Sequence, residues 1–167
     1  MLSMRYLITF TCYGSHLHGD ERGSIDRHHN TVETPLAPAS QPRIQMKQTL
    51  MDQPPYLLDL ERRRTVLAAI KEVCQHRRWT LLAAQVRTNH VHSVVEAEAR
   101  PELIMNSFKS YSSRALNALG IDSPERKSWA RHGSTRWLFK DTNVQEAIRY
   151  VVQEQGDPME VYCSDLL

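Results

Sequence analysis

The sequence predicts an α+β domain in which an antiparallel sheet carries helices packed on one face. Two β-rich segments, 79–86 and 90–96, are separated by only three residues and therefore predict a hairpin. Segments with apolar residues at helical spacing lie before the hairpin, after it and near the C-terminus. The length of 167 residues, 41% apolar and 24% charged, is typical of a single domain spanning 1–167. This order of elements argues against a doubly wound parallel sheet.

The elements before the hairpin are a strand, a long loop and a helix. Residues 6–13 (YLITFTCY) are β-branched or aromatic for the most part, which favours a strand that ends at Gly14. Residues 19–55 contain five of the eight prolines, so we expect a loop-rich excursion at about 19–58 with at most one short helix or turn at 45–51. Asp59 is a candidate N-cap for a helix that runs to about His76.

The elements after the hairpin are a helix, a short strand and a third helix. Pro101 suits the first turn of a helix whose apolar residues recur every three or four positions until Gly120. Residues 136–139 (RWLF) predict a short strand. Thr142 or Asn143 is expected to cap the third helix, which ends before Gly156. The complete order indicates a ferredoxin-like arrangement.

Composition excludes several classes of protein. The 3 cysteines are far apart and form no CxxC pair, so neither a disulfide framework nor a cysteine-rich zinc site is predicted. This usage, together with the lack of an apolar run near about 18 residues and of a cleavage pattern at the N-terminus, leads us to expect a cytoplasmic protein with no membrane partner. No Walker-type, GxGxxG, GxSxG or HExxH motif occurs, so nucleotide-binding, nucleophile-elbow and zincin chemistry lack support.

The charge is distributed unevenly along the chain. Residues 100–140 contain eight Lys or Arg against three Asp or Glu, whereas 141–167 contains one Arg against six acids. The basic stretch predicts either a surface that follows phosphates or a solvated face of mixed charge.

The sharpest candidate site is the sequence NHVH at 89–92. Side chains alternate along a strand, so His90 and His92 project from the same face, where two imidazoles can hold one metal ion. The alternative is a pair of surface histidines. A second pair, His16 and His18, follows Gly14, where alternation no longer applies.

Tyr150 on the third predicted helix is the candidate nucleophile. At about 100° per residue, Glu154 lies about 40° from Tyr150, Gln153 about 60° on the other side and Gln155 about 140° away. Tyr150 and Glu154 therefore share a face, as a nucleophile and a metal ligand would. The alternative is an amphipathic tyrosine beside an apolar stripe. Tyr111 is the rival nucleophile, but its place on an apolar stripe predicts a core residue.

Three segments together resemble the single-tyrosine HUH transposases, insertion-sequence enzymes that include the REP-associated tyrosine transposases. They are residues 8–23, which contain ITF and YGSHLHGDERG, residues 89–95 (NHVHSVV) and residues 148–152 (IRYVV). The resemblance implies the HUH nuclease/transposase fold. It also implies a metal-dependent enzyme that cleaves and rejoins single-stranded DNA through a 5′-phosphotyrosine intermediate and recognises hairpin DNA.

The resemblance also implies roles for the candidate residues. His90 and His92 would bind a catalytic Mg²⁺ or Mn²⁺, and Tyr150 would be the nucleophile. The third ligand in relatives is a polar residue about one turn after the tyrosine, which here is Glu154, with Gln153 and Gln155 as the alternatives. Relatives occur as monomers and dimers, so a homodimer with a tyrosine acting in cis or in trans stays open.

Recognition of DNA needs a surface beyond this site. Basic side chains could neutralise phosphates, and Trp129 and Trp137 could stack on unpaired bases, although Trp137 could equally be a core residue. The basic candidates are Lys109, Arg114, Arg126, Lys127, Arg131, Arg136 and Lys140. Three other functions compete: a hairpin-binding protein that keeps the fold without transposition, a nuclease that uses water, and an RNA-binding module.

Overall fold

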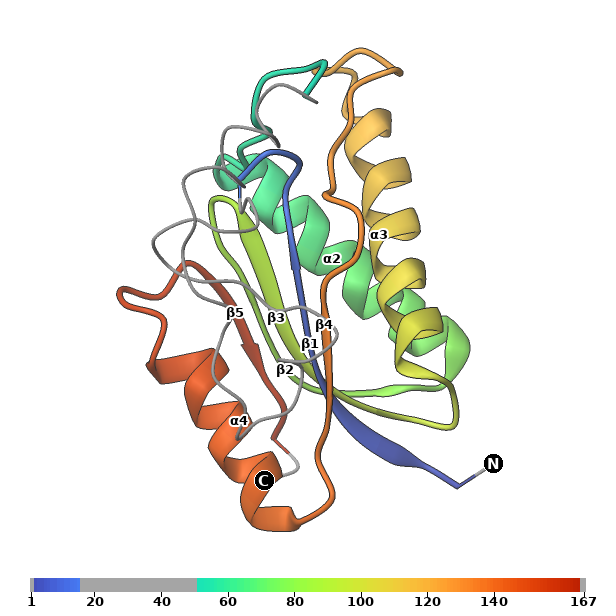
Figure 1. Ribbon diagram of the computed structural model, residues 1–167, viewed down its shortest axis with the longest axis vertical. Helices are drawn as coiled ribbons and strands as arrows, with labels where there is room; N and C mark the ends of the chain where they lie inside the picture. Colours follow the sequence, from blue (N-terminus) through green and yellow to red (C-terminus); the bar gives the residue numbers. More distant parts are fainter. Residues whose placement is uncertain (1, 16–50, 166–167) are drawn as a thin grey trace.

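Five antiparallel strands form one sheet in the order β4-β1-β3-β2-β5 (Figure 1). The computed structural model describes residues 2–15 and 51–165. The strands are β1 (Met4–Thr11), β2 (Thr80–Val86), β3 (His90–Ala97), β4 (Ser134–Trp137) and β5 (Glu160–Cys163). β3 is the central strand, with β1 and β2 on either side of it, and the β2–β3 hairpin is present as predicted.

Helices cover both faces of this sheet. They are α2 (Leu60–Arg77), α3 (Pro101–Ala118) and α4 (Asp141–Gln153). α2 and α3 pack together on one face, and α4 lies on the other (Figure 1). The α+β antiparallel fold is confirmed, but the expectation of helices on one face holds only for α2 and α3.

The alternation of β1 explains why α4 must cover the second face. Tyr6, Ile8 and Phe10 belong to the core beneath α2 and α3, whereas Leu7 belongs to the core beneath α4. Val94 of β3 joins Leu7 on that second side. Because both faces of the sheet are apolar, each needs a helix to remove it from water.

The ends of the first two helices agree with the sequence prediction. Asp59 is the N-cap of α2, and its side chain accepts a hydrogen bond from the Arg62 backbone N–H at 2.9 Å. α3 begins at Pro101, and Gly120 follows its end with a φ of 71°. Local capping chemistry therefore set these boundaries.

Three elements after α3 differ from the prediction, and β1 starts and ends two residues earlier than the predicted strand at 6–13. α4 starts at Asp141 rather than after Thr142 or Asn143, because Asn143 sits inside the first turn and its Oδ1 accepts the Lys140 N–H at 3.3 Å. β4 starts two residues before the predicted 136–139 strand. β5 was not predicted, since four residues are too few to show a period.

β4 can begin at Ser134 because the preceding glycine lets two segments of the polypeptide, the start of β4 and β1, approach closely. A Cβ on Gly133 would lie 2.5 Å from the Thr9 carbonyl oxygen and 2.6 Å from Met105 Sδ. Only a residue without a side chain fits there. This close approach brings β4 alongside β1.

The end of the predicted excursion is well anchored. Tyr56 donates a hydrogen bond to Asp122 Oδ2 at 2.7 Å, and the Leu58 N–H donates to the Thr88 carbonyl at 2.7 Å. Residues 16–50, with His16, His18 and most of the predicted turn at 45–51, lie outside the described residues. Within the described ranges, no helix is long and apolar enough to cross a bilayer.

Candidate active site

β3 places the two histidines of the NHVH sequence on the face that α4 covers. His92 pairs with Thr9 of β1 and with Gln85 of β2, and His90 pairs with Thr11. The imidazole centroids of His90 and His92 are 4.7 Å apart. The expectation that both rings project from one face is therefore confirmed.

His92 is a buried, neutral imidazole with two polar neighbours. Its Nδ1 lies 2.8 Å from Thr9 Oγ1, and the Gln155 side chain lies beside the ring. Burial, followed by the nearby His90, lowers the pKa of His92 to about 3. The ring is therefore uncharged at neutral pH, which is the form that binds a metal ion.

His90 is oriented by its neighbour in the sequence. Its Nδ1 lies 2.6 Å from Asn89 Oδ1. An amide oxygen can only accept, so Nδ1 carries the proton and Nε2 carries the lone pair. A hydrogen bond on one ring nitrogen is the usual way in which proteins orient a histidine that binds metal through the other.

Tyr150 lies next to the histidine pair. Its ring centroid is 5.4 Å from that of His92, and the two planes meet at 72°. The side chain is 39% exposed, whereas the adjacent Val151 is buried in the core under α4. Tyr150 thus sits at the border of the core, with its ring beside His92 and part of its surface open to solvent.

Glu154, the expected third ligand, is not placed with the histidines. α4 ends at Gln153, and Glu154 is its C-cap with a non-helical backbone (φ −107°, ψ 18°). The helical spacing of 100° per residue therefore does not apply to Glu154, because the backbone is no longer helical at that residue. Glu154 is exposed, and among residues 2–15 and 51–165 no group of three His, Cys, Asp or Glu side chains could hold a metal ion.

Gln155 takes the place that was expected for Glu154. The chain folds back after the helix, so that Gln155 Nε2 donates to the Tyr150 carbonyl at 3.1 Å and the same side chain lies beside the His92 ring. Gly156 follows with a φ of 79°, which favours glycine. The Gly156 stop signal could have shown that helical spacing does not extend to Gln155.

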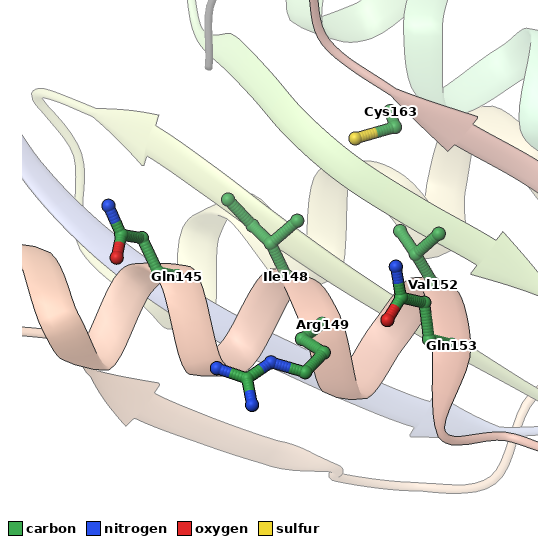
Figure 2. A pocket seen from close by; sticks show the side chains of 6 residues that line it. All are labelled: Gln145, Ile148, Arg149, Val152, Gln153 and Cys163. Carbon is green, nitrogen blue, oxygen red and sulfur yellow. The ribbon is translucent and has the colours of Figure 1, made fainter.

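Gln153, the other alternative, faces a different part of the molecule. It lines a hollow of about 290 Å³ together with Arg149 of α4 and Cys163 of β5 (Figure 2). We therefore place Gln153 outside the group formed by His90, His92 and Tyr150.

The donors at this site fit a divalent metal ion. The two imidazoles and the Gln155 amide are nitrogen and oxygen donors of the kinds that bind divalent metal ions. His92 is neutral, and Thr9 and Asn89 provide the outer hydrogen bonds that fix the two rings.

Arg136 brings positive charge to the same face. Arg136 pairs with Leu7 of β1. Ser134, two positions before Arg136 on β4, pairs with Thr9. Its charge is among the causes that lower the pKa of His92. The side chain is half-buried, and within the described residues it has no acidic partner. In the sequence Arg136 is one of several basic residues, and no local pattern indicates its position beside the histidines.

Two of the candidate DNA contacts instead hold the loop before β4. Lys109 Nζ donates to the carbonyls of Ala130 at 3.0 Å and His132 at 2.6 Å, and burial lowers its pKa to about 8. Trp129 donates from its indole nitrogen to the Lys109 carbonyl, and its ring meets Phe10 edge-on.

Other basic candidates are also engaged elsewhere. Arg126 donates to Gln53 Oε1, and Lys127 forms an ion pair with Asp52 at 2.9 Å. Arg114 lies over the ring of Tyr111 on α3, where Tyr111 packs against the core on the face opposite the histidines. Tyr111 is therefore a core-packing residue, as predicted.

The remaining candidates gather on and beside β4. Trp137 is 43% exposed, and its ring stacks on that of Phe139 with centroids 6.0 Å apart and planes at 12°. The same ring meets Tyr6 of the core beneath α2 and α3 edge-on at 5.0 Å, so both predicted alternatives, a core contact and an exposed ring, apply in part. Arg131 and Lys140 are exposed on either side of the strand. Phe139, which is 70% exposed, was not among the predicted contacts, because the RWLF segment was predicted only as a short strand.

Comparisons with solved structures concern the fold. A REP-associated tyrosine transposase bound to a REP hairpin is 10% identical, with a TM-score of 0.50 over 90% of this chain and 66% of that chain. This chain thus spans just under two thirds of that structure. A Deinococcus radiodurans protein described as a candidate transposase is 13% identical, with a TM-score of 0.48 over 93% of this chain and 92% of that chain.

Comparison with curated proteins gave no match. A family model described as IS200-like transposase matches residues 56–155, which is more than half of the chain. The matched span includes the β2–β3 hairpin, α3 and α4, and with them His90, His92, Tyr150 and Gln155. The chain therefore belongs to the IS200-like transposase family.

Proposed function

We propose that this protein cleaves and rejoins single-stranded DNA in a metal-dependent reaction, with Tyr150 as the nucleophile. The observation that carries the proposal is the position of the Tyr150 ring, 5.4 Å from that of His92. Gln155 supports it, because one side chain contacts both His92 and the Tyr150 carbonyl. Membership of the IS200-like transposase family supports the broader statement that the protein is a DNA-cleaving enzyme.

His90, His92 and Gln155 are the residues that would hold Mg²⁺ or Mn²⁺. Gln155 replaces Glu154 in this role because the chain turns back after Gln153. A divalent cation bound there would polarise the scissile phosphate and offset the charge that develops during the reaction. The protein contributes two fixed imidazoles and an amide.

Tyr150 makes the covalent link. Its Oη forms a bond to phosphorus while the bond from phosphorus to the 3′ oxygen breaks. The phenolic proton leaves to solvent, and the 3′ oxygen gains a proton to become a free hydroxyl group. The product is a 5′-phosphotyrosine. Attack by another 3′-hydroxyl reverses these steps and joins two strands, and one ester replaces another without ATP.

Arg136 is suited to hold the reacting phosphate. A guanidinium donates two parallel hydrogen bonds to phosphate oxygens, and Arg136 is half-buried on the histidine face without an acidic partner among the described residues. Arg131 and Lys140 would contact phosphates further along the strand. Trp137 would stack on an unpaired base, worth about 1–3 kcal/mol.

The DNA substrate that we propose is a hairpin with a single-stranded flank. The structure of the REP-associated tyrosine transposase was solved with a REP hairpin bound, which is a property of that protein. Shared fold and family support the extension to this chain. The basic and aromatic residues along β4 are the contacts that we expect.

A covalent-adduct assay tests this function. Labelled hairpin oligonucleotides from the DNA flanking the gene are incubated with the protein and Mn²⁺ or Mg²⁺, and the products are separated under denaturing conditions. We expect an adduct that is lost in Tyr150→Phe and in His90→Ala. Tyr111→Phe is the matched control, and it should retain the adduct because Tyr111 packs on the opposite face.

Other outcomes would reassign the protein. Cleavage that persists in Tyr150→Phe without an adduct would show a nuclease that uses water. Tight hairpin binding without cleavage under any metal would show a binding protein that keeps the fold.

A further inference from the structure

Gln85 is a fully buried polar side chain on the same sheet face as His92. It lies on β2, pairs with His92 across the hairpin and is 0% exposed. Its Nε2 donates to the Val151 carbonyl at 2.5 Å. Carbonyls in the last turn of a helix lack partners within the helix, and Val151 belongs to that turn because α4 ends at Gln153. Gln85, on the sheet, therefore supplies a hydrogen-bond donor to the last turn of α4, the helix that carries Tyr150.

The other end of the Gln85 amide holds the turn that follows α4. Its Oε1 accepts from Arg87 Nη1 at 2.7 Å and from the Met159 N–H at 3.2 Å. Arg87 Nη1 also donates to the Asp157 carbonyl at 2.9 Å. Gln85 of β2 and Arg87, which directly follows the strand, thus tie down the helix end and the turn after it. We call Gln85 and Arg87 the latch.

The latch lies between the two parts of the candidate site. Gln85 bonds to Val151, which directly follows Tyr150 in the sequence. Arg87 bonds to Asp157, in the turn that follows Gln155. His92 is the register partner of Gln85 on the next strand. The latch therefore fixes the spacing between the strand that carries the histidines and the helix end that carries Tyr150.

We propose that Gln85 and Arg87 are positioning residues, which hold Tyr150 and Gln155 against the histidines of the same chain. The proposal rests on the proposed function of Tyr150. A displacement of about 1 Å at a reacting group costs about 100-fold in rate, so a loosened helix end should slow cleavage strongly. DNA binding through β4 should change little, because neither latch residue lies on that strand.

The experiment compares variants that remove different bonds. Gln85→Leu removes all of its hydrogen bonds at similar volume. Gln85→Glu keeps the acceptors for Arg87 and Met159 and removes the donor to Val151. Arg87→Met removes the guanidinium, and Arg87→Lys restores a cation. Val66→Ala is the matched control, because Val66 is buried in the core on the other face and its truncation lowers stability without touching α4.

Three quantities are measured for each variant: the single-turnover rate of adduct formation at saturating hairpin DNA, the Kd for that DNA, and amide exchange in residues 150–159. For Gln85→Leu and Arg87→Met we expect the rate to fall about 10- to 100-fold, with Kd within about twofold and faster exchange. Arg87→Lys should recover part of the rate. Val66→Ala should keep the wild-type rate and exchange in 150–159.

A folded Gln85→Leu protein that forms the adduct at the wild-type rate at saturating DNA would overturn the proposal, whether or not its Kd is weaker. If wild type forms no adduct, the proposed function fails, and the exchange data alone still report whether the latch holds the helix end. A mixture of Tyr150→Phe and His90→Ala should stay inactive. Recovery of the adduct would show a tyrosine acting on another chain and would contradict a latch within one chain.

Discussion

Asp122 should be one of the most sensitive positions for stability. It lies in the connection between α3 and β4, and its carboxylate binds Arg62 of α2 through Nη2 at 2.9 Å and Nε at 3.2 Å. Tyr56 donates to the same carboxylate at 2.7 Å. The side chains of Arg62 and Asp122 are only 13% and 18% exposed. The network joins the start of α2 and the residues just before it to a connection that lies 60 residues later than Arg62 in the sequence.

The change Asp122→Asn removes the charge while nearly conserving the shape. Loss of one partner of a fully buried pair costs about 3–5 kcal/mol. Arg62 keeps a second ion pair with Asp59 at 2.6 Å and some contact with water, so we expect about 2 kcal/mol here. For a protein of this size, this corresponds to a fall in Tm of about 4–8 °C.

The pH dependence gives the sharper test. The guanidinium of Arg62 holds the pKa of Asp122 below its usual value. The pair therefore stabilises the fold fully above the ordinary carboxyl pKa of about 3.9 and loses this contribution as the pH falls through the lower folded value. The stability difference between wild type and Asp122→Asn should be largest near pH 7 and shrink below about pH 4.

Urea unfolding at pH 7 and at several values below pH 4 measures this difference. Asp52→Asn is the control, because Asp52 pairs with Lys127 at an exposed site and should matter little. A difference below about 0.5 kcal/mol at pH 7, or one that stays constant down to pH 2.5, would refute the reasoning.

Three further predictions concern the site and its surroundings. Thr9→Val removes the hydrogen bond to His92 at nearly constant volume, so Mn²⁺ affinity measured by electron paramagnetic resonance should fall about 10- to 100-fold; unchanged affinity would contradict an outer-shell role. Gly133→Ala places a Cβ 2.5 Å from the Thr9 carbonyl and should cost about 1–3 kcal/mol in thermal unfolding, whereas an unchanged Tm would show that β4 can shift. Trp137→Ala should weaken binding of unpaired DNA by about 1–3 kcal/mol at constant salt, and equal loss for fully paired DNA would argue against stacking.

Local patterns allowed much of the fold to be predicted. The NHVH segment gave the direction of both histidines because strand alternation needs only neighbouring residues. Asp59 and Pro101 gave the starts of α2 and α3, since caps act within one helical turn. The prediction that all helices pack on one face was wrong, because α4 covers the second face. Both faces of β1 are apolar, and the sequence pattern alone does not show which helix covers which face.

The candidate site depended on contacts between distant segments. Helical spacing favoured Glu154, but the helix stops one residue earlier and the chain folds back to bring Gln155 to His92. The basic residues could be counted in the sequence, yet only packing separates Lys109, which holds backbone carbonyls, from Arg136, which lies beside the histidines.

The amino-acid sequence alone shows which chemical groups are available: two imidazoles on one strand face and a tyrosine on the last predicted helix. Contacts between distant segments bring those groups together. The Tyr150 ring reaches His92 because Gln85 and Arg87, some 60 residues earlier, satisfy the open carbonyls and the turn at the end of α4. Such bonds depend on where a helix runs out of its own partners, and that point is set by the fold rather than by local propensity.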